Sequence, residues 1–235
     1  MRPRNGSPPA LRGLRQFGAW RPPRQWYTGV RFIVGILILP STSNVLALSP
    51  KVARRQSRTR DSILAESASL FVNKGFANVS VEEIIAAAGI ARSSFYRFFA
   101  NREDVLAQII RPVFEAGTRD LAEIASKNPR RIMHGIFDSY LDLWNHSPDA
   151  LRLSTRTGGV HFSLFRDVHN EFRGELTRLL ERVERTNILL NGSADFSGRL
   201  IARTAVPTLE VYAGSKDCAQ LFRQTMSGLL LKPEA

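Results

Sequence analysis

Apolar residues recur at helical spacing over most of the chain after residue 57, and no segment there alternates as a half-buried strand does. The clearest case is residues 81–88, whose one apolar face is made of Val81, Ile84, Ile85 and Ala88. Ser80 precedes this segment and Glu83 follows it by three residues, which is the pattern of a helix capping box. The spacing predicts an all-α protein.

The next predicted helix, over residues 92–99, is short and aromatic. Phe95 and Phe99 lie four residues apart and face the preceding helix, while Arg92, Tyr96 and Arg97 fall on the opposite side. Two helices joined by a short glycine turn form the helix-turn-helix pattern. Its second helix enters the major groove of DNA with polar side chains on base edges. The same pattern also allows a plain three-helix core with a solvated polar face.

We expect three parts in chain order. Residues 1–50 are a separate extension, residues 51–104 form a three-helix helix-turn-helix DNA-binding domain, and residues 105–235 form a helical bundle. In the bundle, apolar spacing predicts helices over about 129–147, 149–155, 161–183, 195–213 and 215–231. Pro112 is expected to kink or reset the helix that begins at Arg102.

The formal net charge of +12 is confined to the first quarter of the chain. Residues 1–60 hold 12 basic residues and no acid, which leaves 21 basic and 21 acidic residues from 61 onward. The net charge therefore says little about the folded part, and a DNA-binding function must be inferred from local patterning.

The first fifty residues allow three interpretations. They are rich in Pro, Gly and Arg without helical or strand period, so they are a spurious or dispensable extension, a disordered basic arm, or a targeting segment. Their apolar run, residues 32–39, is far shorter than the roughly 20 residues that a membrane helix needs. We therefore expect no membrane association.

Enzyme chemistry finds little support in the sequence. The motifs GxxxxGK[ST], GxGxxG, HExxH and GxSxG are all absent, so we expect no catalytic activity, no cofactor and no metal site. Cys218 is the single cysteine, which excludes a disulfide framework and fits a reducing cytoplasm. A helical adaptor that does not bind DNA remains an alternative.

The stretch LFVNKGFANVSVEEIIAAAGIARSSFYRFFANREDVL resembles the DNA-binding segment of the TetR family of bacterial transcriptional regulators. The likeness runs from about Thr59 to Leu106. Two positions depart from the family pattern: Ala91 stands where Ser or Thr usually starts the recognition helix, and Phe98 stands where His is frequent. The missing hydroxyl at Ala91 removes a side-chain cap, for which Ser93 or Ser94 could substitute.

The resemblance implies a set of DNA contacts. Base or groove contacts would come from Arg92, Ser93, Tyr96 and Arg97, and phosphate contacts from Ser80, Ser94, Tyr96 and Arg102. Independently, residues 51–60 have the composition of a basic tail that follows the DNA backbone, with Arg54, Arg55 and Arg58 as its contacts.

In the family, the carboxy-terminal half binds an effector, and its last two helices form the dimer interface. By resemblance, we expect dimer contacts from Leu200, Thr204, Leu209, Tyr212, Leu221, Met226 and Leu230. Candidate effector-binding residues are Phe137, Tyr140, Trp144, His161, Phe165 and His169. Taken together, rings with few polar groups suit a small, mostly apolar effector, whereas each residue taken singly fits an ordinary core position better.

The resulting hypothesis is a ligand-responsive repressor that binds palindromic double-stranded DNA as a homodimer. Effector binding would shift the fourth helix and move the two DNA-binding domains of the dimer apart. A transcriptional activator of the same fold is the alternative, because the sign of regulation depends on operator position.

Overall fold

A computed structural model describes residues 50–157 and 159–233, and the predictions for residues 1–49 lie outside this range. Its regular elements, in order, are α1 (Pro50–Lys74), η2 (Phe76–Asn78), α2 (Val81–Ala88), α3 (Arg92–Phe98), α4 (Arg102–Ala122), α5 (Pro129–His146), α6 (Pro148–Arg156), η3 (Gly159–Leu164), α7 (Arg166–Glu184), α8 (Ala194–Tyr212) and α9 (Cys218–Leu230). Within the described residues, β pairing is limited to an isolated bridge between Leu189 and Leu231. The all-α prediction is confirmed.

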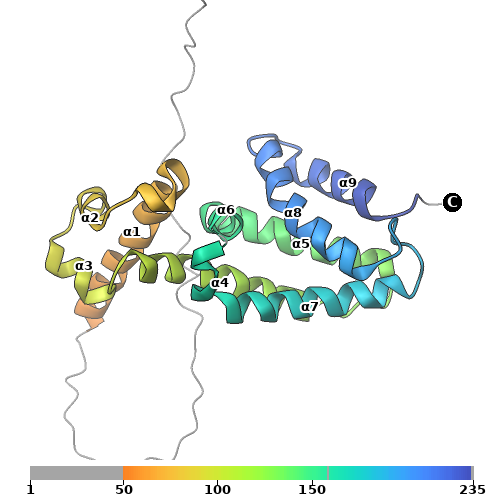
Figure 1. Cartoon of the computed structure of the whole chain (residues 1–235), viewed down its shortest axis with the longest axis horizontal. Coiled ribbons are helices and arrows are strands. Elements are labelled where there is room, and N and C mark those ends of the chain that lie inside the picture. Colours follow the sequence, from red (N-terminus) through yellow and green to blue (C-terminus); the bar gives the residue numbers. More distant parts are fainter. Residues whose placement is uncertain (1–49, 158, 234–235) are drawn as a thin grey trace, which may run out of the picture.

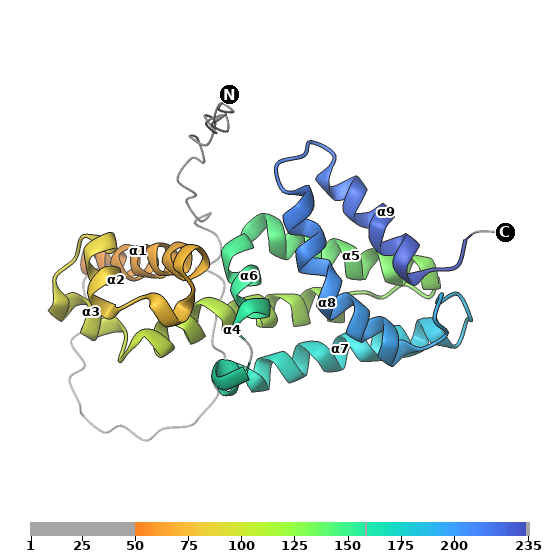
Figure 2. The same cartoon turned by 45° about the horizontal axis from the view of Figure 1, so that its top comes forward.

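The helices form two groups that α4 joins. In Figure 1, α1, α2 and α3 gather at one end of the molecule, while α5 to α9 form an elongated bundle at the other end. α4 begins under the first group and continues into the bundle, where it packs along α7. Figure 2 shows α8 and α9 side by side on one flank of the bundle. The predicted boundary at residue 104 therefore falls inside a continuous helix.

Local sequence explains where the short helices begin and end. The Ser80 hydroxyl accepts a hydrogen bond from the Glu83 amide at 3.2 Å, and the Glu83 carboxylate accepts one from the Ser80 amide at 2.9 Å. This is the predicted capping box of α2. Gly89 ends α2 in the left-handed region, with φ +62°, where a residue without Cβ is favoured. At α4, Asn101 accepts from the Asp104 amide at 2.8 Å.

Three predictions of element bounds were wrong. The basic segment 51–60, expected to be a tail, is helical because α1 begins at Pro50, which fits a first helical turn, and the following Arg, Ala and Gln residues are strong helix formers. α4 runs through Pro112, so the expected reset does not occur, since buried Val113 and Phe114 keep the helix packed beyond the proline. A kink at Pro112 stays a prediction.

The third correction concerns residues 161–183, predicted as one long helix. The structure has a 3-10 segment, η3, followed by α7 from Arg166. Gly159 before it has φ +75°, and Phe165 at the junction has φ −140°, outside the helical region. The chain therefore changes direction here, and His161 and Phe162 contact different parts of the molecule.

Candidate functional site

The short helix α3 is fixed to the protein through its aromatic residues. Phe95 is 0% exposed and Phe99 is 1% exposed, and their ring centroids lie 5.7 Å apart. Ala91, the residue before the helix, gives no side-chain cap, so the missing hydroxyl is not replaced by Ser93 or Ser94. The anchoring of α3 therefore comes from buried rings, and the expected orientation of Phe95 and Phe99 is confirmed.

Arg92, Ser93, Tyr96 and Arg97 lie on the exposed side of α3. Tyr96 keeps 46% of its surface exposed, although its ring also packs edge-on against Phe95 with centroids 5.3 Å apart. An exposed face that carries guanidinium, hydroxyl and phenol groups can donate and accept hydrogen bonds at base edges and phosphates. The structure brings together on one face the four residues for which the resemblance implies base or groove contacts.

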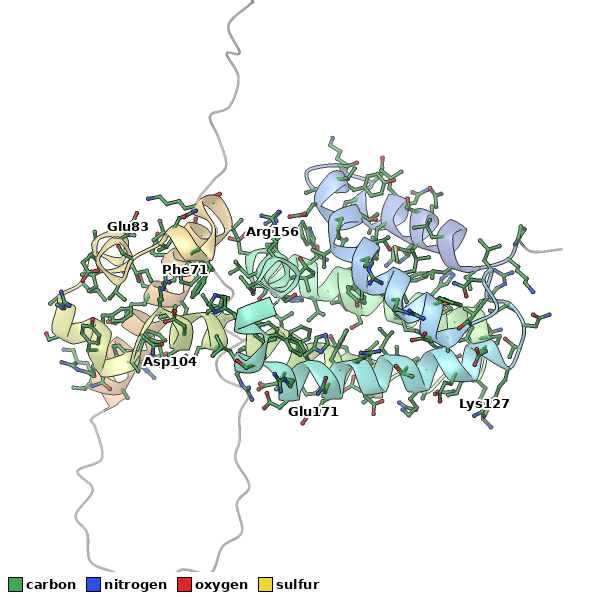
Figure 3. The ribbon with its side chains drawn as sticks, viewed as in Figure 1. Phe71, Glu83, Asp104, Lys127, Arg156 and Glu171 are labelled. Carbon is green, nitrogen blue, oxygen red and sulfur yellow. The ribbon has the colours of Figure 1, made fainter. Side chains whose placement is uncertain are left out.

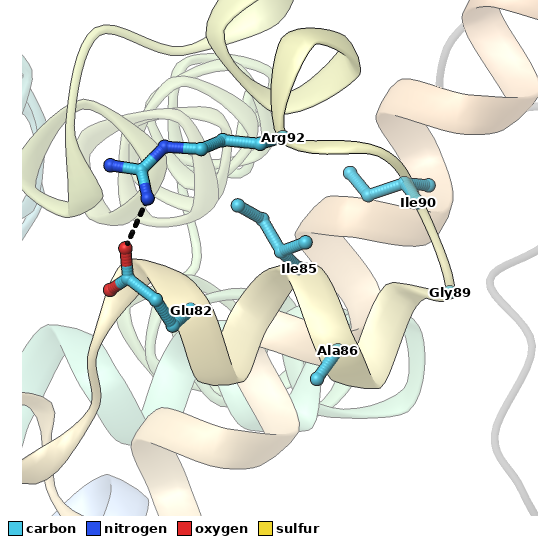
Figure 4. A pocket seen from close by; sticks show the side chains of 6 residues that line it. All are labelled: Glu82, Ile85, Ala86, Gly89, Ile90 and Arg92. Carbon is cyan, nitrogen blue, oxygen red and sulfur yellow. Dashed lines mark hydrogen bonds and ion pairs between the residues drawn. The ribbon is translucent and has the colours of Figure 1, made fainter.

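Arg92 is held in place by two neighbours on this face. Its Nη1 donates to Oε1 of Glu82 on α2 at 3.0 Å, and its Nη2 lies 3.5 Å from the Tyr96 hydroxyl. The guanidinium carbon is 5.5 Å from the centroid of the Tyr96 ring, within range of a cation–π interaction. Figure 4 shows the pair of Arg92 and Glu82 bridging α3 and α2. The sequence analysis did not predict Glu82, because nothing in the local sequence marks an acid as the partner of an arginine on the next helix.

The amino-terminal turns of α1 add a row of cations beside α3. Positions i, i+3, i+4 and i+7 of this helix carry exposed basic residues without an ion-pair partner in the described part of the chain: Lys51, Arg54, Arg55 and Arg58. Arg55 lines the same groove as Ser94 and Arg97 of α3. We call α3 the reading helix, because it is the helix predicted to contact bases. A row of basic residues next to it is suited to neutralising phosphates.

Two predicted phosphate contacts have structural roles. The Arg102 Nη1 donates to the carbonyl oxygens of Phe76, Ala77 and Val79 at 3.3, 3.3 and 2.9 Å. Its guanidinium also lies 4.8 Å from the Phe76 ring centroid. Because this group ties α4 to the chain before α2, we remove Arg102 from the proposed DNA contacts.

Ser80 is exposed, but its hydroxyl serves the capping box with Glu83. The same acid accepts from Lys74 Nζ at 2.6 Å, and this hydrogen bond is the main cause that lowers the pKa of Glu83 to about 2. Glu83 therefore stays ionised and keeps the cap closed at neutral pH. A phosphate contact by Ser80 remains a prediction.

Half of the predicted effector residues, namely Tyr140, Phe165 and His169, meet in one aromatic cluster. We define this aromatic cluster as Phe114 of α4, Tyr140 of α5, Phe162 of η3, Phe165 just before α7, and His169 and Phe172 on α7. The His169 ring lies 5.2 Å from Phe114 and 5.0 Å from Phe162, both edge-on. Phe172 links Phe114 and Tyr140 at 5.7 and 6.0 Å. Phe114, Phe162 and Phe172 were not predicted, although each is a ring on an apolar helical or loop position.

The polar edge of the aromatic cluster is His169. Its Nδ1 is buried and has no hydrogen-bond partner in the described residues. Burial is the main cause that lowers the pKa of His169 below its usual value. The imidazole is therefore neutral at pH 7 and has one ring nitrogen available for a hydrogen bond.

The other three predicted effector residues lie elsewhere. Phe137 packs edge-on against Phe222 of α9, with ring centroids 6.4 Å apart. The Trp144 ring is covered by the Arg152 guanidinium at 4.5 Å. His161 contacts the Phe76 ring, with ring centroids 4.6 Å apart, and so touches the amino-terminal unit, by which we mean α1, η2, α2 and α3. These three are structural contacts between helices or between the two groups of helices, so we leave them out of the proposed effector site.

An ion pair holds α4 against the start of α7, next to the aromatic cluster. Arg111 donates to both carboxylate oxygens of Asp167 at 2.7 Å and to the Leu164 carbonyl at 3.3 Å. The hydrogen bonds from Arg111 are the main cause that lowers the pKa of Asp167 to about 2. α4 is therefore tied to both groups of helices, through Arg102 and through Arg111.

Among the predicted dimer residues, Leu209, Met226 and Leu230 are each 0% exposed within the protomer itself. They form the core between α8, α9 and the bundle, so we remove them from the proposed interface. Leu200, Thr204, Tyr212 and Leu221 are partly exposed. The outer faces of α8 and α9 also carry exposed apolar residues that were not predicted: Phe196 at 58%, Val211 at 77% and Leu229 at 38%.

The described residues contain no cluster of His, Cys, Asp and Glu able to hold a metal ion. In the same part of the chain, none of the helices has an apolar stretch of sufficient length to cross a bilayer.

The fold is a helix-turn-helix unit, of the kind that binds DNA, with an attached helical bundle. Residues 63–109 match the model of bacterial regulatory proteins of the tetR family. The chain is 30% identical over 132 residues to the HTH-type transcriptional regulator TcmR of Streptomyces glaucescens, covering 56% of each chain. It is 29% identical over 96 residues to the HTH-type transcriptional regulator EthR of Mycolicibacterium smegmatis, covering 40% of this chain and 44% of EthR.

The chain thus spans about half the length of the curated relatives it matches. Among solved structures, the ketosteroid transcriptional regulator KstR2 of Mycobacterium tuberculosis superposes with a TM-score of 0.60 and 21% identity, over 74% of this chain and 95% of that chain. At this identity the superposition concerns the fold. Residues 63–109 thus resemble the DNA-binding segment of the tetR family, and this likeness supports a TetR-type transcriptional regulator.

Proposed function

We propose that the protein is a ligand-responsive repressor that binds a palindromic operator as a homodimer. The observation that carries the proposal is the exposed face of α3, where Arg92, Tyr96 and Arg97 project from a helix fixed by two fully buried rings. Rigid placement matters because each base contact requires donors and acceptors at defined positions. The basic row of α1 supplies phosphate contacts beside it.

A dimer is required because one short helix reads few base pairs. Two such helices about 34–36 Å apart read two half-sites on one side of the duplex. The exposed apolar residues Phe196, Val211 and Leu229 on α8 and α9 support this flank as the interface, since dimer formation there would remove large apolar side chains from water. Figure 2 places α8 and α9 on a flank away from α2 and α3, which leaves the reading helix free.

The effector site that we propose is the aromatic cluster of α4, α5, η3 and α7. Its rings suit an apolar ligand, and the unpartnered Nδ1 of His169 provides one hydrogen bond. A ligand that separates Phe114 from α7 displaces α4, which carries the amino-terminal unit through Arg102. A preference of a few kcal/mol for the displaced state is enough to release DNA.

The test is selection of bound sequences from random duplex DNA, followed by a screen for small molecules that release the selected duplex. The expected result is an enriched palindrome whose half-sites are one helical turn apart. Arg97→Ala should relax sequence choice at one base pair per half-site and cost about 1–3 kcal/mol there. Lys127→Ala removes a cation at the far end of the molecule and should leave binding unchanged (Figure 3). Equal loss on selected and random DNA for Arg97→Ala would contradict the base-reading role.

A further inference from the structure

We call the exposed face of α3 together with the adjoining first turn of α2 the reading surface. It contains an acidic residue at a place where attraction to DNA alone would favour a basic residue. Glu82 lies in the first turn of α2, with 63% of its side chain exposed, and its carboxylate faces the guanidinium of Arg92, which is 66% exposed. Figure 4 shows the two side chains meeting above a shallow hollow between α2 and α3, whose apolar lining is Ile85, Ala86 and Ile90. A carboxylate here repels the phosphates of a bound duplex.

The helix cap does not account for Glu82. An acid in the first turn of a helix stabilises it, but Glu83 already fills that role by closing the capping box with Ser80 and by pairing with Lys74. An exposed ion pair at 3.0 Å also contributes little to folding. The position of the carboxylate is therefore better explained by what it does to Arg92.

We propose that Glu82 is a specificity-determining residue of the reading surface, which positions Arg92 and prevents it from acting as a general phosphate contact. The inference rests on the DNA-binding function proposed above. Glu82 occupies Nη1, and the Tyr96 ring and hydroxyl limit the rest of the guanidinium, so the remaining N–H groups are held in one orientation. Since the pair carries no net charge, it gains free energy on DNA only where a base edge offers acceptors, as guanine does with O6 and N7.

The other cations near the reading helix behave differently. Arg55 and Arg97 line a common groove, and neither has an acid partner among the described residues. Without such a partner they can bind phosphate on any sequence, so Arg97 adds to general attraction to DNA beside its proposed base contact. Of the two arginines on α3, Arg92 is thus the one that an acidic partner keeps from binding phosphate on any sequence.

The experiment compares wild type, Glu82→Gln and Glu171→Gln on two probes: the duplex selected by the wild-type protein and a random-sequence duplex of equal length. Glu82→Gln frees Arg92 for one added phosphate contact. We expect about fivefold tighter binding to random duplex near 0.15 M salt, and a salt dependence steeper by about 0.9 in log–log slope. Binding to the selected duplex should gain less, and repeated selection should show relaxed choice at one base pair per half-site.

Glu171→Gln is the matched control, because it removes the same charge from α7, far from the reading helix (Figure 3). It should leave the ratio of affinities for the two probes unchanged. In an Arg92→Ala background, Glu82→Gln should improve binding to both probes equally, since no guanidinium is left to position. Circular dichroism confirms that each variant is folded, and Glu82→Ala repeats the measurement with a second side chain.

An unchanged affinity ratio for both Glu82→Gln and Glu82→Ala would overturn the proposal, as would an equal change in Glu171→Gln. A wild-type protein that enriches no sequence at all would instead contradict the proposed operator-binding function.

Discussion

The crossing of α4 and α7 allows a quantitative test of packing at the proposed effector site. Gly117 of α4 faces α7, and a Cβ added there would lie 2.7 Å from Cε2 of Phe172 and 3.1 Å from Cδ1 of Leu143. The first distance is well inside van der Waals contact, so Phe172 must shift. Gly174 of α7 is exposed, and a Cβ added there would meet nothing within 4 Å. The two glycines form a matched pair within helices.

Substitution by alanine gives both positions the same gain in helix propensity, about 1 kcal/mol. At Gly174 nothing opposes it, so Gly174→Ala should stabilise the protein by about 0.5–1 kcal/mol. At Gly117 the added methyl group overpacks a buried contact, which costs about 1–3 kcal/mol. The free energy of unfolding of Gly117→Ala should therefore lie about 1–3 kcal/mol below that of Gly174→Ala, because the propensity gain cancels in the comparison.

The assay is urea unfolding followed by circular dichroism, with thermal unfolding as a second measurement, where each 1 kcal/mol corresponds to about 2–4 °C in Tm. Equal stability of the two variants would show that α4 and α7 do not cross as closely as the structure indicates. It would also weaken the proposal that a ligand entering beside Phe172 must move α4.

Three further outcomes are expected. Arg102→Met should lower the free energy of unfolding by about 2 kcal/mol, because carbonyl oxygens lose a charged donor and the Phe76 ring loses its cation; a loss of DNA binding with unchanged stability in urea would restore the phosphate role. Burial lowers the pKa of His169, so on acidification the unfolded chain takes up a proton on this residue at a higher pH than the folded protein does. The contribution of His169 to the free energy of unfolding should be complete above about pH 6.5 and fall as the pH drops below it. Urea midpoints measured from pH 8 to 5 should therefore decline less in His169→Gln than in wild type. Val211→Glu places a charge on the exposed face of α8 and should shift the protein from dimer to monomer in sedimentation velocity, whereas Leu190→Glu, exposed in the loop before α8, should not.

Local patterns in the sequence determined most of the helices and the orientation of the reading helix. The capping box of Ser80 and Glu83 and the cap at Asn101 were readable because a cap involves residues only three positions apart. The inward side of α3 was readable for the same reason, since Phe95 and Phe99 are one helical turn apart and both are buried.

Tertiary structure decided which residues from different helices meet, because periodicity gives the face of a helix but not the neighbour that covers it. The pairing of Glu82 with Arg92 depends on the angle between α2 and α3, and the diversion of Arg102 to backbone carbonyls depends on where α4 passes under η2. The same holds for the aromatic residues: Phe137 and Phe165 read alike in sequence, yet one packs on Phe222 of α9 and the other joins Phe114 of α4. Those contacts are set by how the helices cross, which the free energy of the whole core determines.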